Sequence, residues 1–286
     1  MFKFRKGCAL IALLALSALC FALIVHAVGG SENAVWPDPL GEKVQSDGKL
    51  IVDYSQRELG YVMVRVSQQT SHGLKLRVNY GNASLPDSDP NKYAQLTYNI
   101  DNTGLYETIP LPLGSGYYEF QLYENVKGNK YSAEGKVAMT VQLVDENAAF
   151  LVANQYVSYM KSSLTVQKSD ELCAGKSAAD TYKTICEFMS KEFAYDFVRA
   201  LTIKAGTLPE VDPCFERRMG ICQDLSAVMV CMLRVQGIPA KLVIGYADKN
   251  YHAWTVAIVD GEERFFDPTA AVGALGASNY TVERMY

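Results

Sequence analysis

The chain has 286 residues, of which 49% are hydrophobic and 20% are charged. It can therefore bury the core of two ordinary domains, and its composition is not that of a disordered protein. The formal net charge of −4 gives no electrostatic case for binding nucleic acid, so we expect no such partner.

The N-terminal segment has the pattern of a secretory signal. Three basic residues among the first six precede an apolar run over residues 8–25, and Ala27 follows where a signal peptidase prefers a small residue. We expect residues 1–27 to be a cleaved signal peptide and the protein to be secreted or extracellular. Because the run is long for a signal, an uncleaved membrane anchor at the cell surface is the alternative.

The next part of the chain predicts a β-sandwich. Residues 28–48 are rich in glycine, proline and polar residues and predict a linker. Residues 49–145 alternate apolar and polar side chains with a period of two. Seven such stretches are separated by turn-forming clusters: KLIVDY, YVMVRVS, LKLRVNY, AQLTYNI, LYETIPL, GYYEFQLYE and KVAMTVQLV. Seven short strands predict an antiparallel sandwich. We find no group of residues in it that could form a catalytic site. Its expected partner is a cell-wall or surface component.

Residues 146–169 are predicted to connect the sandwich to a second domain, residues 170–286, with both helices and strands. Residues 178–193 carry apolar side chains at helical spacing, and residues 205–220 read as a loop. An apolar helix is predicted from Cys222 to about residue 236, before Gly237.

Three strands follow that helix: KLVIGYA, HAWTVAIV and RFFD. Asp260-Gly261, between the last two, predicts a two-residue hairpin turn. The whole chain is therefore expected to be an α+β protein with an N-terminal antiparallel β-sandwich.

Five cysteines remain after the predicted signal, all in the C-terminal half: Cys173, Cys186, Cys214, Cys222 and Cys231. An odd number in an exported protein leaves at least one unpaired within the chain. Cys186 and Cys231 fall within apolar helical patterns and are expected in the core. Cys173 and Cys214 lie in loop-like stretches on either side of the helix over 178–193, and we expect a disulfide between them.

Cys222 stands at a helix N-terminus, where free N–H groups favour a thiolate. A nucleophilic cysteine needs a base, and His252 is the one histidine in this half of the chain. A two-residue turn would set Trp254 opposite Asp267 and bring His252 diagonally close to Asp267, which could orient the imidazole. Each residue alone also has a structural interpretation: a small apolar thiol, a strand histidine and a turn aspartate.

Three further features bear on this candidate site. The backbone N–H of Cys222 is the predicted oxyanion donor. Trp254 either walls the site or packs in the core. No C-x-x-C pair is present and only one histidine is near, so we expect neither a metal nor a cofactor.

The blocks GICQDLSAVMVCMLRVQGIPAKLVIGY, YHAW and FFDPTA resemble the three signature blocks of the transglutaminase-like superfamily. The upstream FAYDFVRA and GTLPEVD resemble secreted bacterial members. The resemblance covers roughly residues 170–270 and implies a fold similar to that of papain-type cysteine proteases. It implies that Cys222 is the nucleophile, His252 the base and Asp267 the orienting carboxylate.

The function that follows from the resemblance is cysteine-dependent acyl transfer on protein or peptide amides through a thioester. A cysteine peptidase or amidase with the same triad is an alternative, because pocket shape decides whether an amine or water accepts the acyl group. A non-catalytic cell-surface binding module is a third. The expected partner is a protein or peptide substrate, with membrane contact only if the N-terminal segment is uncleaved.

Overall fold

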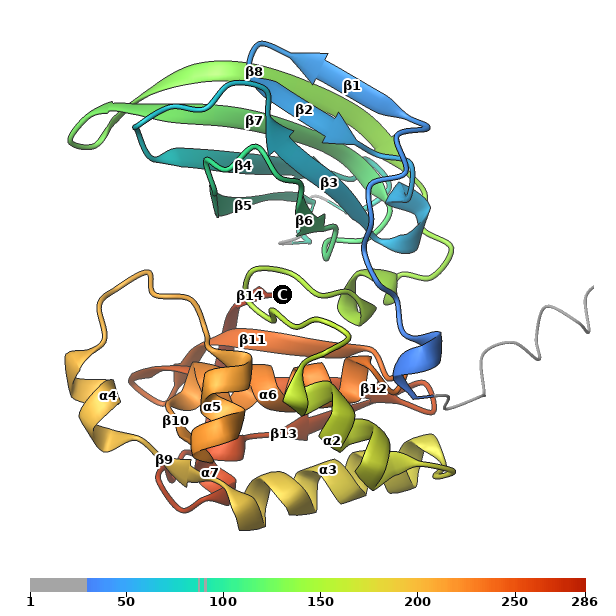
Figure 1. The fold of residues 1–286 in the computed structure, drawn as a ribbon, viewed down its shortest axis with the longest axis vertical. Helices are drawn as coiled ribbons and strands as arrows, with labels where there is room; N and C mark the ends of the chain where they lie inside the picture. Colours follow the sequence, from blue (N-terminus) through green and yellow to red (C-terminus); the bar gives the residue numbers. More distant parts are fainter. Residues whose placement is uncertain (1–29, 87, 90–91) are drawn as a thin grey trace, which may run out of the picture.

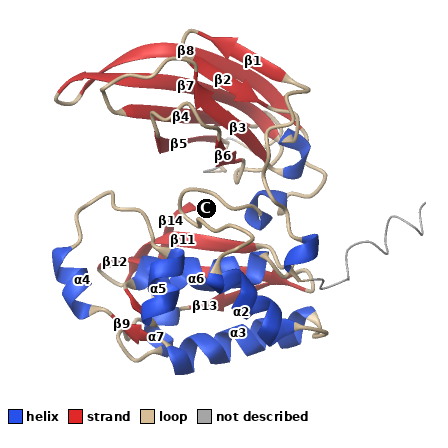
Figure 2. Ribbon diagram, viewed as in Figure 1, coloured by secondary structure: helices blue, strands red, loops and turns tan. Residues whose placement is uncertain are grey.

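The computed structural model describes residues 30–86, 88–89 and 92–286. The predicted signal peptide, residues 1–27, lies outside the described residues, and its cleavage stays a prediction. The described chain forms an all-β part stacked on a part in which helices and a sheet form layers (Figures 1 and 2). Within these described ranges, no helix is long and apolar enough to cross a membrane.

The predicted β-sandwich is confirmed. Its two antiparallel sheets have the strand orders β1-β2-β3-β6 and β5-β4-β7-β8. All seven predicted strands are present: β2 (Leu50–Asp53), β3 (Tyr61–Val66), β4 (Leu74–Gly81), β5 (Tyr93–Ile100), β6 (Glu107–Pro110), β7 (Gly116–Lys127) and β8 (Lys130–Val141). Alternate residues of β4 are buried, so one face of the strand supplies core residues such as Leu76 and Val78. An eighth strand, β1 (Val44–Asp47), lies in the predicted linker; all its residues are exposed, so it has no apolar alternation.

The C-terminal part is built around helix α6 (Cys222–Arg234). This helix packs on β11 (Ala240–Ala247) and β12 (Asn250–Val259) of a sheet with the order β13-β12-β11-β14. Three helices cover its other side: α2 (Leu164–Cys173), α3 (Ala178–Glu192) and α5 (Val211–Arg217) (Figure 1). Because the sheet and the three helices enclose α6, most of its side chains are buried, which explains why the helix is apolar on most of its faces.

Several short elements of this part were not predicted. The segment 205–220 was predicted as a loop, which is wrong in part, because it contains α5. The other elements absent from the prediction are α2, α4 (Phe197–Thr202), α7 (Pro268–Ala271), β9 (Ala194–Tyr195), β10 (Met219–Gly220) and β14 (Tyr280–Met285). Strand β13 (Glu262–Phe266) completes the predicted hairpin. Helices and strands of only a few residues carry too little periodicity to be recognised.

The expected disulfide between Cys173 and Cys214 is wrong. Both thiols are free and buried, and so is that of Cys231. Cys173 is the last residue of α2 and Cys214 lies inside α5, so neither is in a loop. The Cys214 sulfur packs against Gly220, where an added Cβ would lie 2.6 Å from it.

A fully buried arginine joins the two parts of the chain. Arg234, near the end of α6, donates hydrogen bonds to the backbone oxygens of Val152 (2.5 Å), Ala240 (2.9 and 2.8 Å) and Tyr286 (2.8 Å). Val152 belongs to the segment that follows the sandwich. Burial lowers the pKa of Arg234 to about 10, which leaves it charged near neutral pH.

We expect Arg234→Met to destabilise the protein by about 3–5 kcal/mol, because it leaves buried backbone oxygens without a donor. The free energy of unfolding in urea measures this effect. Arg264→Met is the matched control, because Arg264 is half exposed and forms an ion pair with Glu262 at the surface. Equal effects of the two substitutions would contradict the role assigned to Arg234.

Candidate active site

Cys222 is the first residue of α6 and is partly exposed. The chain enters the helix through a narrow passage at Gly220. An added Cβ there would lie 2.6 Å from the Cys214 sulfur and 2.8 Å from the Asp224 Cβ. Glycine is therefore required at this position, because a side chain would collide with both of these atoms.

Asp224 fixes the position of this helix start. Its carboxylate is completely buried and accepts hydrogen bonds from the backbone N–H groups of Ile221 (3.1 Å) and Glu210 (3.1 Å). The Arg199 guanidinium donates a third bond of 2.9 Å, from helix α4. An acidic side chain in the first turn also faces the positive end of the helix dipole. Nothing in the local pattern pointed to Arg199.

The hairpin of β12 and β13 has the predicted register. Asp260 (φ 53°) and Gly261 (φ 80°) both adopt the left-handed conformation that a two-residue type I′ turn needs. Thr255 pairs with Phe266, so the next position sets Trp254 opposite Asp267. His252 lies diagonally across, and its Nε2 is 2.9 Å from Oδ2 of Asp267.

Asp267 is held on both of its oxygens. It caps helix α7, where Oδ1 accepts from the backbone N–H groups of Thr269 (2.9 Å) and Ala270 (3.2 Å). Oδ2 accepts from His252 and from the Tyr280 hydroxyl, at 2.8 Å. Burial opposes ionisation of Asp267, but the hydrogen bonds from His252 and Tyr280 outweigh it, so its pKa is lowered. The carboxylate is thus charged and fixed in orientation.

The Cys222 side chain lies close enough to His252 to raise the pKa of the imidazole. Because Nε2 faces Asp267, Nδ1 is the nitrogen left for the sulfur. Burial lowers the pKa of His252, but Asp267 and a Cys222 thiolate outweigh this effect and raise it to about 9. The structure therefore brings Cys222, His252 and Asp267 into one chain of contacts, with His252 in the middle.

The sequence model of the transglutaminase-like superfamily matches residues 163–266, which contain Cys222 and His252. These residues form a transglutaminase-like domain. The resemblance inferred from the three sequence blocks is confirmed. No sequence among the curated proteins matches the chain.

Solved structures give weaker likenesses. A candidate cysteine protease from Cytophaga hutchinsonii is 14% identical, with a TM-score of 0.39; the match covers 79% of this chain and 91% of that one. A candidate protease from Parabacteroides distasonis is 11% identical, with a TM-score of 0.32 and coverage of 72% and 62%. Red sea bream transglutaminase is 14% identical, with a TM-score of 0.30 and coverage of 73% and 48%. With TM-scores below 0.4, these likenesses carry no argument about the substrate or reaction of this protein.

Aromatic side chains lie near both His252 and Cys222. Trp254 is 2% exposed, and its ring lies 6.3 Å from that of His252 at an angle of 23°. It is therefore a buried wall of the site as well as a core residue. Tyr280 of β14 packs edge-on against Trp254, with 5.1 Å between the ring centroids. Tyr195 of β9 lies close enough for the charge of a Cys222 thiolate to affect its phenol, and burial raises its pKa to about 12.

Two of these residues were not predicted. Tyr280 and Tyr195 lie on strands β14 and β9, which meet the site only through sheet pairing: β14 pairs with β11, and β9 pairs with β10 next to the nucleophile. Among the described residues, no group of three or more His, Cys, Asp or Glu side chains is arranged to hold a metal ion.

We expect His252 to titrate near pH 9 in the folded protein, as measured by NMR of its ring protons. Asp267→Asn and Cys222→Ala should each lower this pKa, because each removes a partner that favours the imidazolium. A pKa near the ordinary 6.5 in the unsubstituted protein would contradict the contacts described here.

The same shift predicts a pH dependence of stability. Because the folded state holds the His252 proton more tightly than the unfolded state, its stabilising contribution is complete below pH 6.5 and is lost as pH rises through about 9. His252→Gln should flatten the free energy of unfolding over this window. If the free energy of unfolding of His252→Gln changed with pH as steeply as that of the unsubstituted protein, groups other than His252 would control the pH dependence.

We expect Tyr280→Phe to weaken the site while retaining the ring packing. Loss of the hydroxyl removes one donor to Asp267 Oδ2, so the pKa of Asp267 should rise and the imidazole should be held less firmly. The measurable result is a lower rate of Cys222 alkylation at neutral pH and a shifted pH profile. Tyr246→Phe is the control, since Tyr246 is exposed and contacts Tyr251 instead.

Proposed function

We propose that the protein is an exported enzyme that transfers acyl groups from protein or peptide amides to an acceptor through a Cys222 thioester. The observation that supports this proposal is the Cys222–His252–Asp267 contact chain at the start of a buried helix. A purely structural cysteine would not need a charged carboxylate behind the neighbouring histidine, held by three further hydrogen-bond donors.

In the proposed first half-reaction the Cys222 thiolate attacks the amide carbon, and the carbonyl oxygen gains negative charge. The N–H of Cys222, at the first turn of α6, has no partner within the helix and is the proposed oxyanion donor. The tetrahedral intermediate then collapses, the C–N bond breaks, and the His252 imidazolium gives its proton to the leaving ammonia or amine. A thioester and a neutral imidazole remain.

In the second half-reaction an amine or water attacks the thioester. His252 takes a proton from this acceptor, the C–S bond breaks, and the thiolate–imidazolium pair is restored. Asp267 stays charged throughout and holds the ring so that Nδ1 faces the sulfur. Water as the acceptor would make the protein a peptidase or amidase with the same triad, which is the second candidate function.

A hollow lined by residues of β9, α4 and the segment before Cys222 could receive the chain that carries the amide. It has a volume of about 720 Å³ and is lined in part by Tyr195, Phe197, Val198 and Met219. Met219 lies three positions before Cys222, and both Phe197 and Val198 are more than 60% exposed. A substrate with apolar side chains near the reacting amide would cover these residues.

Export, and attachment of the sandwich to a cell-wall or surface component, are parts of the proposal that rest on sequence. The N-terminal pattern of residues 1–27 supports export. The strand pattern of the sandwich, with no catalytic set, supports a binding role rather than a chemical one.

The proposal is tested by mass spectrometry of a glutamine-containing peptide, incubated with the protein with and without a primary amine. Incorporation of the amine would show transamidation. Conversion of glutamine to glutamate would show deamidation, and backbone cleavage would show peptidase activity. A thioester trapped on Cys222 would support the common first step.

Substitutions separate chemistry from folding. Cys222→Ala should abolish turnover, and His252→Ala and Asp267→Asn should lower it roughly 10²–10⁴-fold while the fold is kept. Cys231→Ala is the matched thiol control, because Cys231 is fully buried in the middle of α6 and should leave activity intact. Full activity in His252→Ala would sink the proposal.

A further inference from the structure

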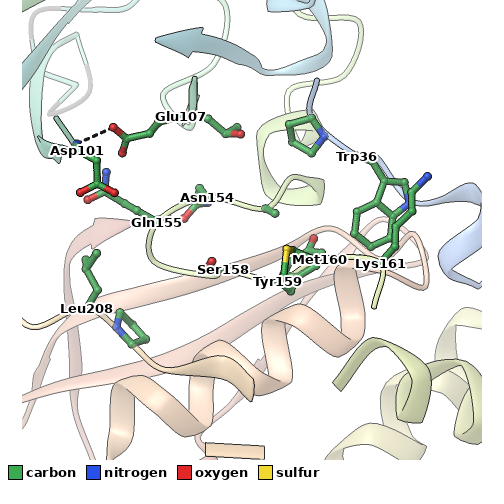
Figure 3. Close-up of a pocket in the computed structure, with 14 residues that line it drawn as sticks. Trp36, Asp101, Glu107, Asn154, Gln155, Ser158, Tyr159, Met160, Lys161 and Leu208 are labelled. Carbon is green, nitrogen blue, oxygen red and sulfur yellow. Dashed lines mark hydrogen bonds between the residues drawn. The ribbon is translucent and has the colours of Figure 1, made fainter. Parts of the chain in front are cut away.

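A second cavity lies between the sandwich and the transglutaminase-like domain (Figure 3). Its volume is about 650 Å³, within the range of roughly 300–1,000 Å³ that small-molecule sites occupy. Segments from four parts of the chain line it, represented by Trp36, Glu107, Asn154 and Leu208. None of the three candidate catalytic residues is among its lining residues.

Two neighbouring side chains of this cavity have buried polar atoms without partners in the described chain. Asn154 is 5% exposed, and its Oδ1 accepts from the backbone N–H groups of Tyr156 (2.9 Å) and Val157 (3.2 Å), whereas its Nδ2 has no acceptor. Gln155 Nε2 donates to the Asn99 carbonyl (3.2 Å), but Oε1 has no donor. One free donor and one free acceptor therefore stand on adjacent residues, at a cost that native proteins rarely accept without a function.

The two ends of the cavity carry opposite charge. Asp101 and Glu107 lie at one end, joined by a 2.7 Å hydrogen bond from the Asp101 N–H to Glu107, and Lys161 lies at the other beside Trp36 (Figure 3). Within the described residues, neither these carboxylates nor Lys161 takes part in a salt bridge, and the Lys161 ammonium lies 5.5 Å from the centroid of the Trp36 ring. Burial raises the pKa of Glu107 to about 7, so a bound cation would favour its charged form.

We propose that this interdomain cavity binds a short peptide with free amino and carboxyl ends. A peptide group supplies both missing partners: its carbonyl accepts from Asn154 Nδ2, and its N–H donates to Gln155 Oε1. The ligand's ammonium group pairs with Asp101 and Glu107, and its carboxylate pairs with Lys161. A neutral saccharide could satisfy the two amides but would leave both charged ends without a counter-ion.

A single loop connects this cavity to the candidate active site. Leu208 and Pro209 line the cavity. The preceding residue, Thr207, accepts a 3.0 Å hydrogen bond from Gln223, next to Cys222, and the following residue, Glu210, donates to Asp224. The peptide site is nevertheless separate from the reacting atoms, so its test does not depend on turnover.

The test is calorimetric titration of the full chain carrying Cys222→Ala, which excludes covalent capture. The probes are tetra-alanine with free ends, its N-acetylated form and its C-amidated form. The free peptide should bind, and each capped form should bind roughly 10-fold or more weakly, because it loses one charged contact. Absence of binding by the free peptide would overturn the proposal.

Matched substitutions assign each end. With Asp101→Asn and Glu107→Gln combined, N-acetylation should no longer weaken binding, because both partners of the ammonium group are then neutral; with Lys161→Met, C-amidation should no longer do so. Glu119→Gln and Lys168→Met are the controls, since these residues lie outside the cavity. In both variants, N-acetylation and C-amidation of the peptide should weaken binding as much as they do in the unsubstituted protein. Equal binding of free and capped peptides, or tight binding of a neutral oligosaccharide that ignores Glu107 and Lys161, would also overturn it.

Discussion

The buried carboxylate of Asp224 is the constraint on which the site depends. It is charged, has no contact with solvent, and is balanced by Arg199 and two backbone N–H groups. A buried charge that loses such partners is costly, so the three segments that supply them must assemble together. The position of Cys222, two residues before Asp224, is therefore set by a side chain that takes no part in the proposed reaction.

Asp267 has the same role on the other side of the imidazole. Helix α7 supplies two donors from its first turn, and β14 supplies the Tyr280 hydroxyl, so His252 meets a carboxylate that cannot rotate away. The nucleophile and its base are thus fixed from separate directions, by a helix start and by a hairpin. Electrostatic preorganisation of this kind is what acyl transfer requires, because no reorganisation is then needed as charge develops.

The features that were predictable from the sequence are those encoded locally. Period-two alternation located the seven main strands, and Asp260-Gly261 fixed the register that joins His252 to Asp267. Tyr280 and Arg199 reach the site only through long-range packing, which no local pattern records. Cys173 and Cys214 were misplaced because the short helices that bury them have weak periodicity. The interdomain cavity depends on residues from four distant segments, so it could not be predicted.

The hairpin register has a consequence for changes in chain length. The turn at Asp260-Gly261 can lengthen without disturbing the strand pairs beyond it. An insertion of one residue between Glu262 and Asp267 moves the carboxylate to the opposite face of the sheet if the pairs nearest the turn are kept and no bulge forms. An insertion of two would restore the face but carry the carboxylate about 7 Å along the strand, out of reach of His252. The number of residues between the turn and Asp267 therefore sets the position of the carboxylate, and it matters more than the identity of most of these residues.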